Sequence, residues 1–406
     1  SLSAGRDWRG PIADRLYLPT ADGGGAITDA VTQTYNVVNT GRALAGLEPL
    51  RPKNGARFHF ELPGSVQGFQ PVTTGRATLT LENVSGHSRS GERSLALHFD
   101  KVRAGNSVAA ETLTFIPPAD LAMRGYSLIA SPTLYPGQTV RTSLSADTAN
   151  PTPVKVELYL KYYGTSNHQD QSITLTDSAA SLPPGESADL RWTIPNLGGD
   201  PIAAIGVALS ADRSARGSVY LDYLTWDGAP DVVLGRPADG SSVWSRAWVD
   251  ATDEPDEHHR PEAYRVIQDY GRGLLIQGTR DWTDYQVSAT LTPHMAAATG
   301  IAARVQGLRR YYALLLRQGD TVQLIKSLDG ERVLASAPLQ WEPGQPYTLQ
   351  IRAAGRQLQA LVNGQMVFIV KDEDRPLLGG AVALVVEEGR VGCEAVEVHP
   401  LDSPLS

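Results

Sequence analysis

The first stretch with potential for chemistry is a triple glycine, Gly23–Gly25, which precedes a segment of helical pattern. Glycine-rich loops before helices bind phosphate through backbone amides, but they also need a preceding strand and usually a lysine in fixed register. No such lysine follows, and the spacing matches neither known phosphate-loop pattern. We therefore predict a structural turn here, with Asp22 and Asp29 as turn-forming or capping residues.

Residues suited to sugar recognition occur in the stretch YLKYYGTSNHQDQ. Sugar rings offer apolar CH faces to aromatic side chains and hydroxyl groups to planar polar side chains. We predict a ligand-binding loop that contains Tyr162, Tyr163, Asn167 and His168. Because neighbouring residues of a strand point to opposite faces, one of the two tyrosines should lie in the core.

A second set of candidate ligand-binding residues lies further along the chain. Arg304 and Gln306 share one strand face, and Tyr312 lies on the strand that follows. The face with Arg304 and Gln306 is predicted to be either a concave ligand surface or a solvated polar face. Trp282 and Tyr285 are expected in the core, as the resemblance of this series to a known sandwich fold, given below, implies.

Catalytic and metal-binding patterns are sparse. The segment Asp250–Glu262 concentrates acidic residues around His258 and His259, but adjacent histidines of a strand point apart, and the composition is typical of an exposed loop. Cys393, the single cysteine, is expected to fill a strand in a core. No spacing identifies a pair of glycosidase carboxylates.

The elements that must position these residues are short strands. After a helical pattern over Thr28–Ala45 and a linker at Glu48–Gly55, apolar and polar residues alternate in two series, 57–226 and 272–389. The segment Asp227–Ser241, rich in proline and glycine, separates the two series. Such spacing predicts antiparallel sandwiches rather than a parallel sheet.

The predicted fold class is therefore mainly β, with two tandem antiparallel β-sandwiches after a short loop-helix segment. The predicted domains are 1–54, 55–228 and 229–406. Asn363 and Gly364 predict a tight hairpin between two strands of the second sandwich. Trp192 alternates with apolar neighbours and is expected to be buried, and Trp226 is expected to pack the two sandwiches together.

The bulk composition narrows the class of partner. Of the 406 residues 41% are hydrophobic, enough for real cores, and the formal charge of -8 with no basic block excludes a nucleic-acid partner. No apolar run is long enough to span a membrane, and no signal peptide is visible. The chain does not begin with Met, which suggests a processed product or a fragment. A secreted or extracytoplasmic location is favoured.

Three stretches of the first series, FHFELPGSVQGFQPV, SGHSRSGERSLALHF and GSVYLDYLTWDG, resemble a galactose-binding-like jelly roll of the carbohydrate-binding-module type. That resemblance implies a structural Ca²⁺ held by Glu61 and Asp222, helped by backbone carbonyls around Ser90–Ser94. The second series resembles a concanavalin/laminin-G-like sandwich over most of Trp282–Val398. The stretches on which this resemblance rests include GIAARVQGLRRYYALLLR and QPYTLQIRAAGRQLQALVNG.

The opening segment, RDWRGPIADRLYLPTADGGGAITDAVTQTYNVVNTGRALAG, resembles the far C-terminal end of an ADP-ribosylglycohydrolase catalytic domain. In that family acidic motifs hold two magnesium ions, and none of these motifs is present here. The resemblance implies that this chain is the C-terminal portion of a larger protein whose catalytic core lies elsewhere.

The leading hypothesis is a non-catalytic, carbohydrate-binding accessory region that positions an attached hydrolase on a polysaccharide or other glycan. Two alternatives remain. The concanavalin-like sandwich can itself be a glycoside hydrolase or lyase. The region can also be purely structural, for docking to a catalytic domain or for oligomerisation.

Overall fold

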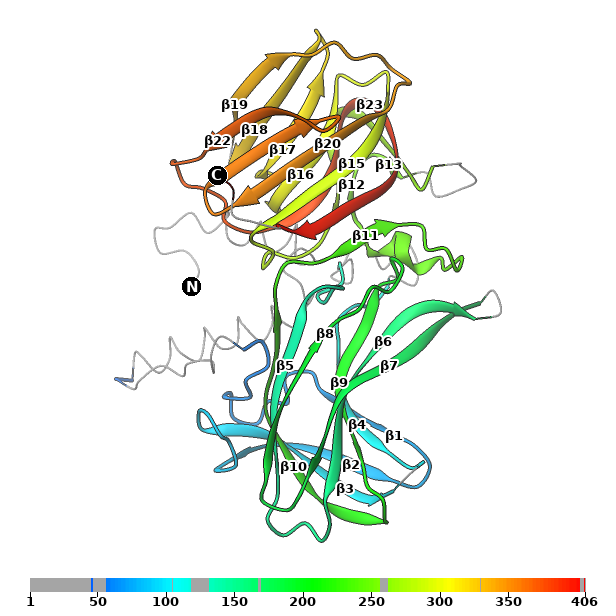
Figure 1. The fold of residues 1–406 in the computed structure, drawn as a ribbon, viewed down its shortest axis with the longest axis vertical. Helices are drawn as coiled ribbons and strands as arrows, with labels where there is room; N and C mark the ends of the chain where they lie inside the picture. Colours follow the sequence, from blue (N-terminus) through cyan, green and yellow to red (C-terminus); the bar gives the residue numbers. More distant parts are fainter. Residues whose placement is uncertain are drawn as a thin grey trace.

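The computed structural model describes residues 45–46, 56–103, 105–117, 131–166, 169–255, 262–328, 330–401 and 405. This part of the chain is almost entirely β, which confirms the predicted fold class (Figure 1). The triple glycine, the predicted helix up to Leu44, and the pairs Asn167–His168 and His258–His259 lie outside the described residues. Within the described residues no helix is long and apolar enough to cross a membrane.

The first sandwich consists of two five-stranded sheets whose strands pair antiparallel. One sheet has the order β1 (Gln70–Thr73), β4 (Val108–Leu113), β9 (Ile202–Ser210), β6 (Val154–Ser166) and β7 (Gln169–Leu182). The other has the order β2 (Thr78–Ser85), β3 (Arg93–Val102), β10 (Ala215–Asp227), β5 (Thr139–Ala146) and β8 (Ser187–Thr193). Alternating apolar side chains from both sheets form one core, and Trp192 is buried in it as predicted.

The second sandwich begins after a short connection. Its elements are β11 (Val232–Gly235), the 3₁₀ helix η3 (Val243–Ala247), β12 (Val249–Ala251), β13 (Glu254–Pro255), β14 (Tyr264–Gln277), β15 (Tyr285–His294), β16 (Ala298–Gly307), β17 (Arg310–Arg317), β18 (Thr321–Leu328), β19 (Glu331–Pro338), β20 (Tyr347–Ala354), β21 (Gln357–Val362), β22 (Gln365–Lys371) and β23 (Ala381–Pro400). Between β21 and β22, Asn363 and Gly364 both have positive φ, of 49° and 78°, which confirms the predicted tight hairpin.

Strand β23, of 20 residues, joins the two layers of the second sandwich. Its first part pairs with β14 and β16, and its second part pairs with β15 and β11. The layers that result place β16, β17 and β18 opposite β15, β20 and β21 around a common core. Trp282 and Tyr285 are buried in that core, and Cys393 of β23 is buried there too, as predicted.

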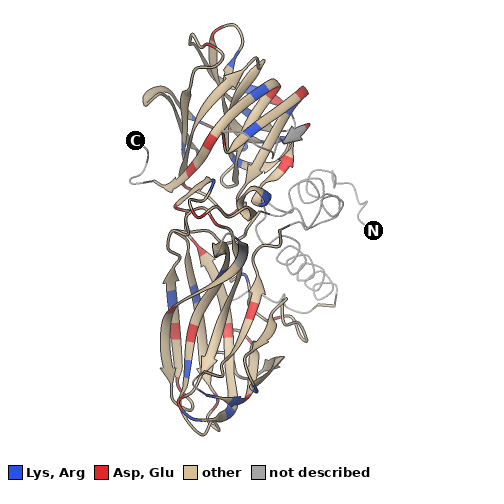
Figure 2. Cartoon of the chain, turned by 90° about the vertical axis from the view of Figure 1, so that its right-hand side faces the viewer, with Lys and Arg blue, Asp and Glu red and all other residues tan. Residues whose placement is uncertain are grey.

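The two sandwiches meet end to end (Figure 1). The ring of Tyr135, from the first, lies edge-on to Trp282 of the second, with ring centroids 4.8 Å apart. Arg57 packs over the ring of Trp226 and forms an ion pair with Asp281. Trp226 is thus a core residue of the first sandwich whose link to the second sandwich runs through Arg57. Acidic and basic residues are interspersed on both sandwiches in the view of Figure 2.

Candidate functional site

The two predicted metal-binding residues, Glu61 and Asp222, both contact one loop of the first sandwich. Asp222, on β10, accepts hydrogen bonds from the backbone amides of Arg89 and Ser90 at 3.1 and 3.2 Å. Glu61 accepts from the amide of Glu92 at 3.0 Å. Both carboxylates are buried, and the loop between β2 and β3 connects them.

These contacts correct one detail of the calcium prediction. The loop presents N–H groups to both carboxylates, whereas carbonyl oxygens around Ser90–Ser94 were expected. Calcium takes six to eight oxygen ligands, and two carboxylates supply only part of that number. In the described part of the chain no group of three or more His, Cys, Asp or Glu side chains is arranged to hold a metal. Carboxylates are the residue type that calcium prefers, Glu61 and Asp222 would supply part of its ligands, and calcium binding stays a prediction.

Tyr162 and Tyr163, at the end of β6, point to opposite faces of the sheet as predicted. Tyr162 packs against the core of the first sandwich. Tyr163 packs edge-on against Phe115, in a small cluster with Val243 and Ala247 of the connecting 3₁₀ helix. Both rings are therefore engaged in packing, and burial raises the pKa of each phenol.

The expected open face with Arg304 and Gln306 does not exist in the structure, because the Arg304 side chain is buried. Arg304 has a φ of +52° within an irregular part of β16, and its guanidinium donates to the carbonyl oxygens of Thr283, Gly355 and Leu377. Gln306 donates to the carbonyl oxygen of Gly379 at 2.7 Å. Both side chains hold loops together in place of lining an open ligand surface.

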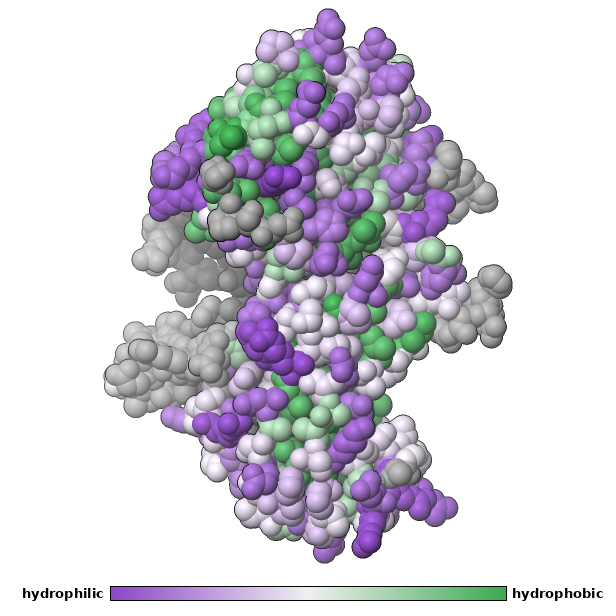
Figure 3. Space-filling view, in the orientation of Figure 1, coloured by the Kyte–Doolittle hydropathy of each residue, from purple (hydrophilic) through white to green (hydrophobic). Residues whose placement is uncertain are grey.

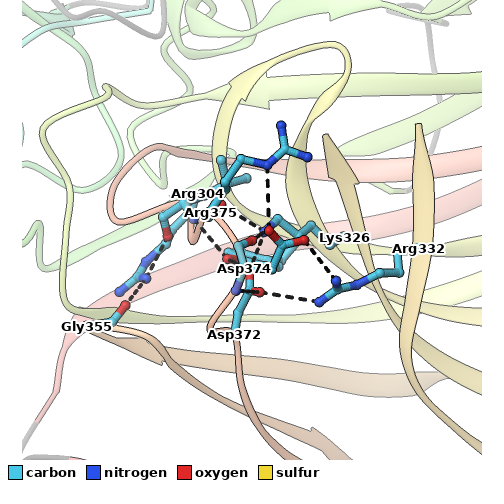
Figure 4. A network of polar contacts seen from close by, with 9 residues as sticks. Arg304, Lys326, Arg332, Gly355, Asp372, Asp374 and Arg375 are labelled. Carbon is cyan, nitrogen blue, oxygen red and sulfur yellow. Dashed lines mark hydrogen bonds and ion pairs between the residues drawn. The ribbon is translucent and has the colours of Figure 1, made fainter. Parts of the chain in front are cut away.

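Tyr312 is buried as well, in a network of polar groups (Figure 4). Its hydroxyl donates to Asp372 at 2.6 Å and accepts from the amide of Leu377 at 2.9 Å. Lys326 donates to the same carboxylate oxygen at 2.6 Å and to the carbonyl oxygen of Arg375 at 2.8 Å. Burial acts to raise the pKa of Asp372, but the hydrogen bonds from Lys326 and Tyr312 lower it below its ordinary value. This network fixes the loop after β22.

A different set of residues presents an aromatic ring to solvent beside charged groups. Between Gln268 and Arg272 the strand β14 bulges, so that three of its residues lie opposite Glu388 alone on β23. Tyr270 is in this bulge and its side chain is 85% exposed. The bulge is held by a bond from the Gln268 amide to the carbonyl oxygen of Tyr270, at 2.7 Å.

Next to the bulge, Arg272 of β14 contacts residues of three other strands, β17, β19 and β23, on the face of the layer that points away from the common core. Its Nε donates to Glu387 and its Nη2 to Glu331, both at 2.6 Å, while its Nη1 contacts the Tyr311 hydroxyl at 2.8 Å. Arg317 donates to the other oxygen of Glu331 at 2.7 Å. We call these five residues, Arg272, Tyr311, Arg317, Glu331 and Glu387, the ion cluster.

The ion cluster is charge-balanced and partly open to solvent. Glu331 has 36% of its side chain exposed, against 16% for Arg272. Burial acts to lower the pKa of Arg272, but its contacts with Tyr311 and Glu387 raise it above the ordinary value. The guanidinium is therefore permanently charged, and it holds the two carboxylates in fixed positions.

A cavity of about 220 Å³ adjoins Glu331. Besides Glu331 it is lined by Lys326, Arg332, Asp374 and Arg375, together with Leu328 and Gly330. Glu331 is thus shared between the ion cluster and the cavity. The surface that combines Tyr270, the ion cluster and this cavity is the candidate site.

Sequence reasoning missed this site. The one local signal was the stretch QDYGRG, in which an aromatic residue stands among polar residues and glycines inside a long strand. Such an interruption is typical of a bulge, and bulges re-aim side chains next to functional sites. The remaining members are scattered over β17, β19 and β23 and come together only through the order of the strands.

No model of a protein family and no curated protein matches this chain. Solved structures similar to it include the carbohydrate-binding module CBM66 from Bacillus subtilis, at 16% identity over 37% of this chain and 94% of that one, with a TM-score of 0.34. The CBM22-2 xylan-binding domain of Paenibacillus barcinonensis Xyn10C is similar at 16% identity over 42% and 96%, with a TM-score of 0.28. Sheep galectin-11 is similar at 13% identity over 33% and 99%, with a TM-score of 0.25.

These structural neighbours are carbohydrate-binding modules and galectins, all of them β-sandwich proteins. At such identities and scores the likeness carries no argument about the function of this chain. None of the comparisons relates the chain to ADP-ribosylglycohydrolases.

Proposed function

We propose that this chain binds carbohydrate, and that the second sandwich does so at the surface formed by Tyr270, the ion cluster and the adjoining cavity. The observation that carries the proposal is the exposure of Tyr270, two residues before Arg272 of the ion cluster, whose Glu331 is partly open to solvent. Among the described residues Tyr270 is the one aromatic side chain that stands as an exposed large hydrophobic group. An exposed ring costs hydration free energy, which a stacked sugar recovers.

Each group has a role that its chemistry supports. The ring of Tyr270 offers a flat apolar face to the CH groups of a pyranose or furanose. Glu331 offers carboxylate oxygens as acceptors for sugar hydroxyls, since 36% of its side chain is open. Arg272 and Arg317 hold that carboxylate in place, so little side-chain entropy is lost when the sugar binds.

The test is electrophoresis in native gels that contain xylan, mixed-linkage β-glucan or galactan, preceded by a glycan array. We expect retardation by at least one glycan, and a loss of about tenfold in affinity for Tyr270→Ala, equivalent to roughly 1.4 kcal/mol. Tyr270→Phe keeps the ring and should bind like the wild type. Met295→Ala changes an equally exposed side chain and serves as the matched control.

Two results would contradict the proposal. One is no retardation by any glycan, and the other is an equal loss of affinity for Tyr270→Ala and Met295→Ala. The same samples are assayed for reducing ends, because release of product would favour the alternative of a glycoside hydrolase or lyase. A sandwich that only binds glycan releases no reducing ends.

We extend this proposal to the purpose of glycan binding: the chain positions an attached hydrolase on its glycan. It is supported by the resemblance of residues 1–54 to the tail of a glycohydrolase catalytic domain, a segment that lies almost wholly outside the described residues. A protein that contains both the hydrolase and this chain should then be retarded in the gel as much as this chain alone. Only the protein with the hydrolase should cleave the substrate.

A further inference from the structure

The cavity beside Glu331 is small and has two exposed arginines in its lining. Its volume of about 220 Å³ is below the range of about 300–1,000 Å³ for drug-sized ligands, so it suits a single sugar unit or a charged substituent. The side chains of Arg332 and Arg375 are 52% and 72% exposed. Figure 3 shows hydrophilic residues at the left edge of the second sandwich, beside β22 as Figure 1 labels it.

The two arginines share one carboxylate. Arg332 donates to one oxygen of Asp374 at 3.1 Å, and the Nε of Arg375 lies 3.7 Å from the other oxygen. Figure 4 shows the two side chains approaching Asp374 from different sides. Lys326 fixes the backbone of this loop through its bond to the carbonyl oxygen of Arg375. Because each guanidinium has five N–H donors, one carboxylate cannot satisfy both of them.

Positive charges outnumber negative ones around the cavity, among the described residues. Glu331, the other carboxylate in the lining, already accepts from Arg272 and Arg317. The linked cations are Arg272, Arg317, Lys326, Arg332, Arg356, Lys371 and Arg375, and the linked or neighbouring carboxylates are Glu331, Glu387, Asp372, Glu373 and Asp374. Asp329 lies outside the described residues, and even its charge would leave one cation in excess. On a chain with a formal charge of -8, this local excess favours an anionic ligand.

We propose that the cavity binds the anionic group of an acidic glycan, either a uronate carboxylate or a sulfate ester. This inference rests on the proposed function, because it names the class of glycan that the surface with Tyr270 takes. The guanidinium groups of Arg332 and Arg375 donate to the anion, since their forked donors match its oxygens. A neutral sugar offers the same donors only hydroxyl groups, which accept weaker hydrogen bonds than an anion does.

The test is a glycan array of matched pairs. In each pair the acidic member carries a uronate or a sulfate ester, and its neutral counterpart is the methyl ester or the desulfated form. We expect at least one acidic member to bind about tenfold more tightly than its counterpart at about 0.15 M salt, where exposed charges more than about 8 Å apart are largely screened. The uronate pairs and the sulfate pairs distinguish the two sources of the charge.

Variants of the exposed arginines locate this preference. Arg332→Gln and Arg375→Gln should each lower the affinity for the acidic member about five- to tenfold and leave the affinity for the neutral member unchanged. Arg356→Gln removes an exposed charge outside the cavity and should keep the preference. An unchanged Tm in all three variants shows that each one is folded.

The outcomes separate this inference from the proposed function. Equal affinity for both members of every pair, an equal loss in Arg356→Gln, or an equal loss for the neutral member would overturn the anionic site. Binding that still depends on Tyr270 would then support the proposed function alone. An absence of binding to every glycan would overturn both.

Discussion

Arg272 donates from Nη2 to Glu331 at 2.6 Å, although the two residues belong to β14 and β19, with β23, β16, β17 and β18 between them in the sheet. Because neighbouring strands lie about 4.8 Å apart, one side chain reaches both strands only if the layer curves so that β14 and β19 approach each other. Tyr270 precedes Arg272 by two residues, and this contact is the basis of the binding surface proposed above.

Replacement of Arg272 tests whether this contact organises the surface. Arg272→Met removes the donors to Glu331, Glu387 and Tyr311, and it leaves two partly buried carboxylates in proximity. We expect the unfolding free energy to fall by about 1–3 kcal/mol and the glycan affinity to fall at least tenfold. Urea unfolding and gel retardation measure the two effects. Arg356→Met, at an exposed position outside the candidate site, is the control and should change neither quantity.

Arg304 should behave in the opposite way to a ligand-binding residue. Arg304→Met leaves the carbonyl oxygens of Thr283, Gly355 and Leu377 without their buried charged donor. We expect a loss of about 3–5 kcal/mol in unfolding free energy, with unchanged glycan affinity in the folded fraction. A change of affinity without a change of stability would restore Arg304 as a ligand-binding residue.

The buried carboxyl of Asp372 gives a dependence of stability on pH. Its pKa is below the ordinary value in the folded state, because the bonds from Lys326 and Tyr312 outweigh the effect of burial. The stability that it contributes is therefore fully present above the unfolded pKa of about 3.9, and it is lost as the pH falls through the folded pKa. The difference in unfolding free energy between the wild type and Asp372→Asn should be largest near neutral pH and should narrow below about pH 4. A difference that is constant from pH 7 to pH 3 would contradict this assignment.

Calcium binding by the first sandwich is tested by thermal unfolding in CaCl₂ and in EDTA. We expect calcium to raise the Tm, because an ion that binds only the folded state stabilises it, and Asp222→Asn to remove the increment. Asp189→Asn, which alters a more exposed carboxylate, should keep it. Identical curves in EDTA and in calcium would mean that the amides of Arg89, Ser90 and Glu92 are sufficient partners for the two carboxylates.

The parts of the fold that follow from local pattern were predictable. Alternation predicted the burial of Trp192, the pair Asn363–Gly364 predicted its hairpin, and the two adjacent tyrosines of β6 point apart as a strand requires. Arg304 was not predictable, because a single residue with positive φ breaks the alternation that the sequence shows. From the sequence alone, an arginine between apolar neighbours is predicted to be exposed, because the carbonyl groups that accept its hydrogen bonds in the fold are not known.

The candidate site was unpredictable for a different reason. Arg272 and Glu331 are 59 residues apart in the chain, and nothing local links them. Their proximity depends on the order of six strands and on the curvature of the layer, which are properties of the whole sandwich. Tyr270 alone carried a local signal, as an aromatic residue in a glycine-containing bulge.

The position of β23 determines when the second sandwich can form. This strand comes last in the sandwich and pairs with β11, β14, β15 and β16. Neither layer can therefore be completed before residues 381–400 are present. On the ribosome, the strands of the first sandwich, which end at Asp227, can pair while the second is still being synthesised. The second sandwich then folds late and all at once, and a chain that stops before Ala381 keeps the first module but loses the central strand of the other.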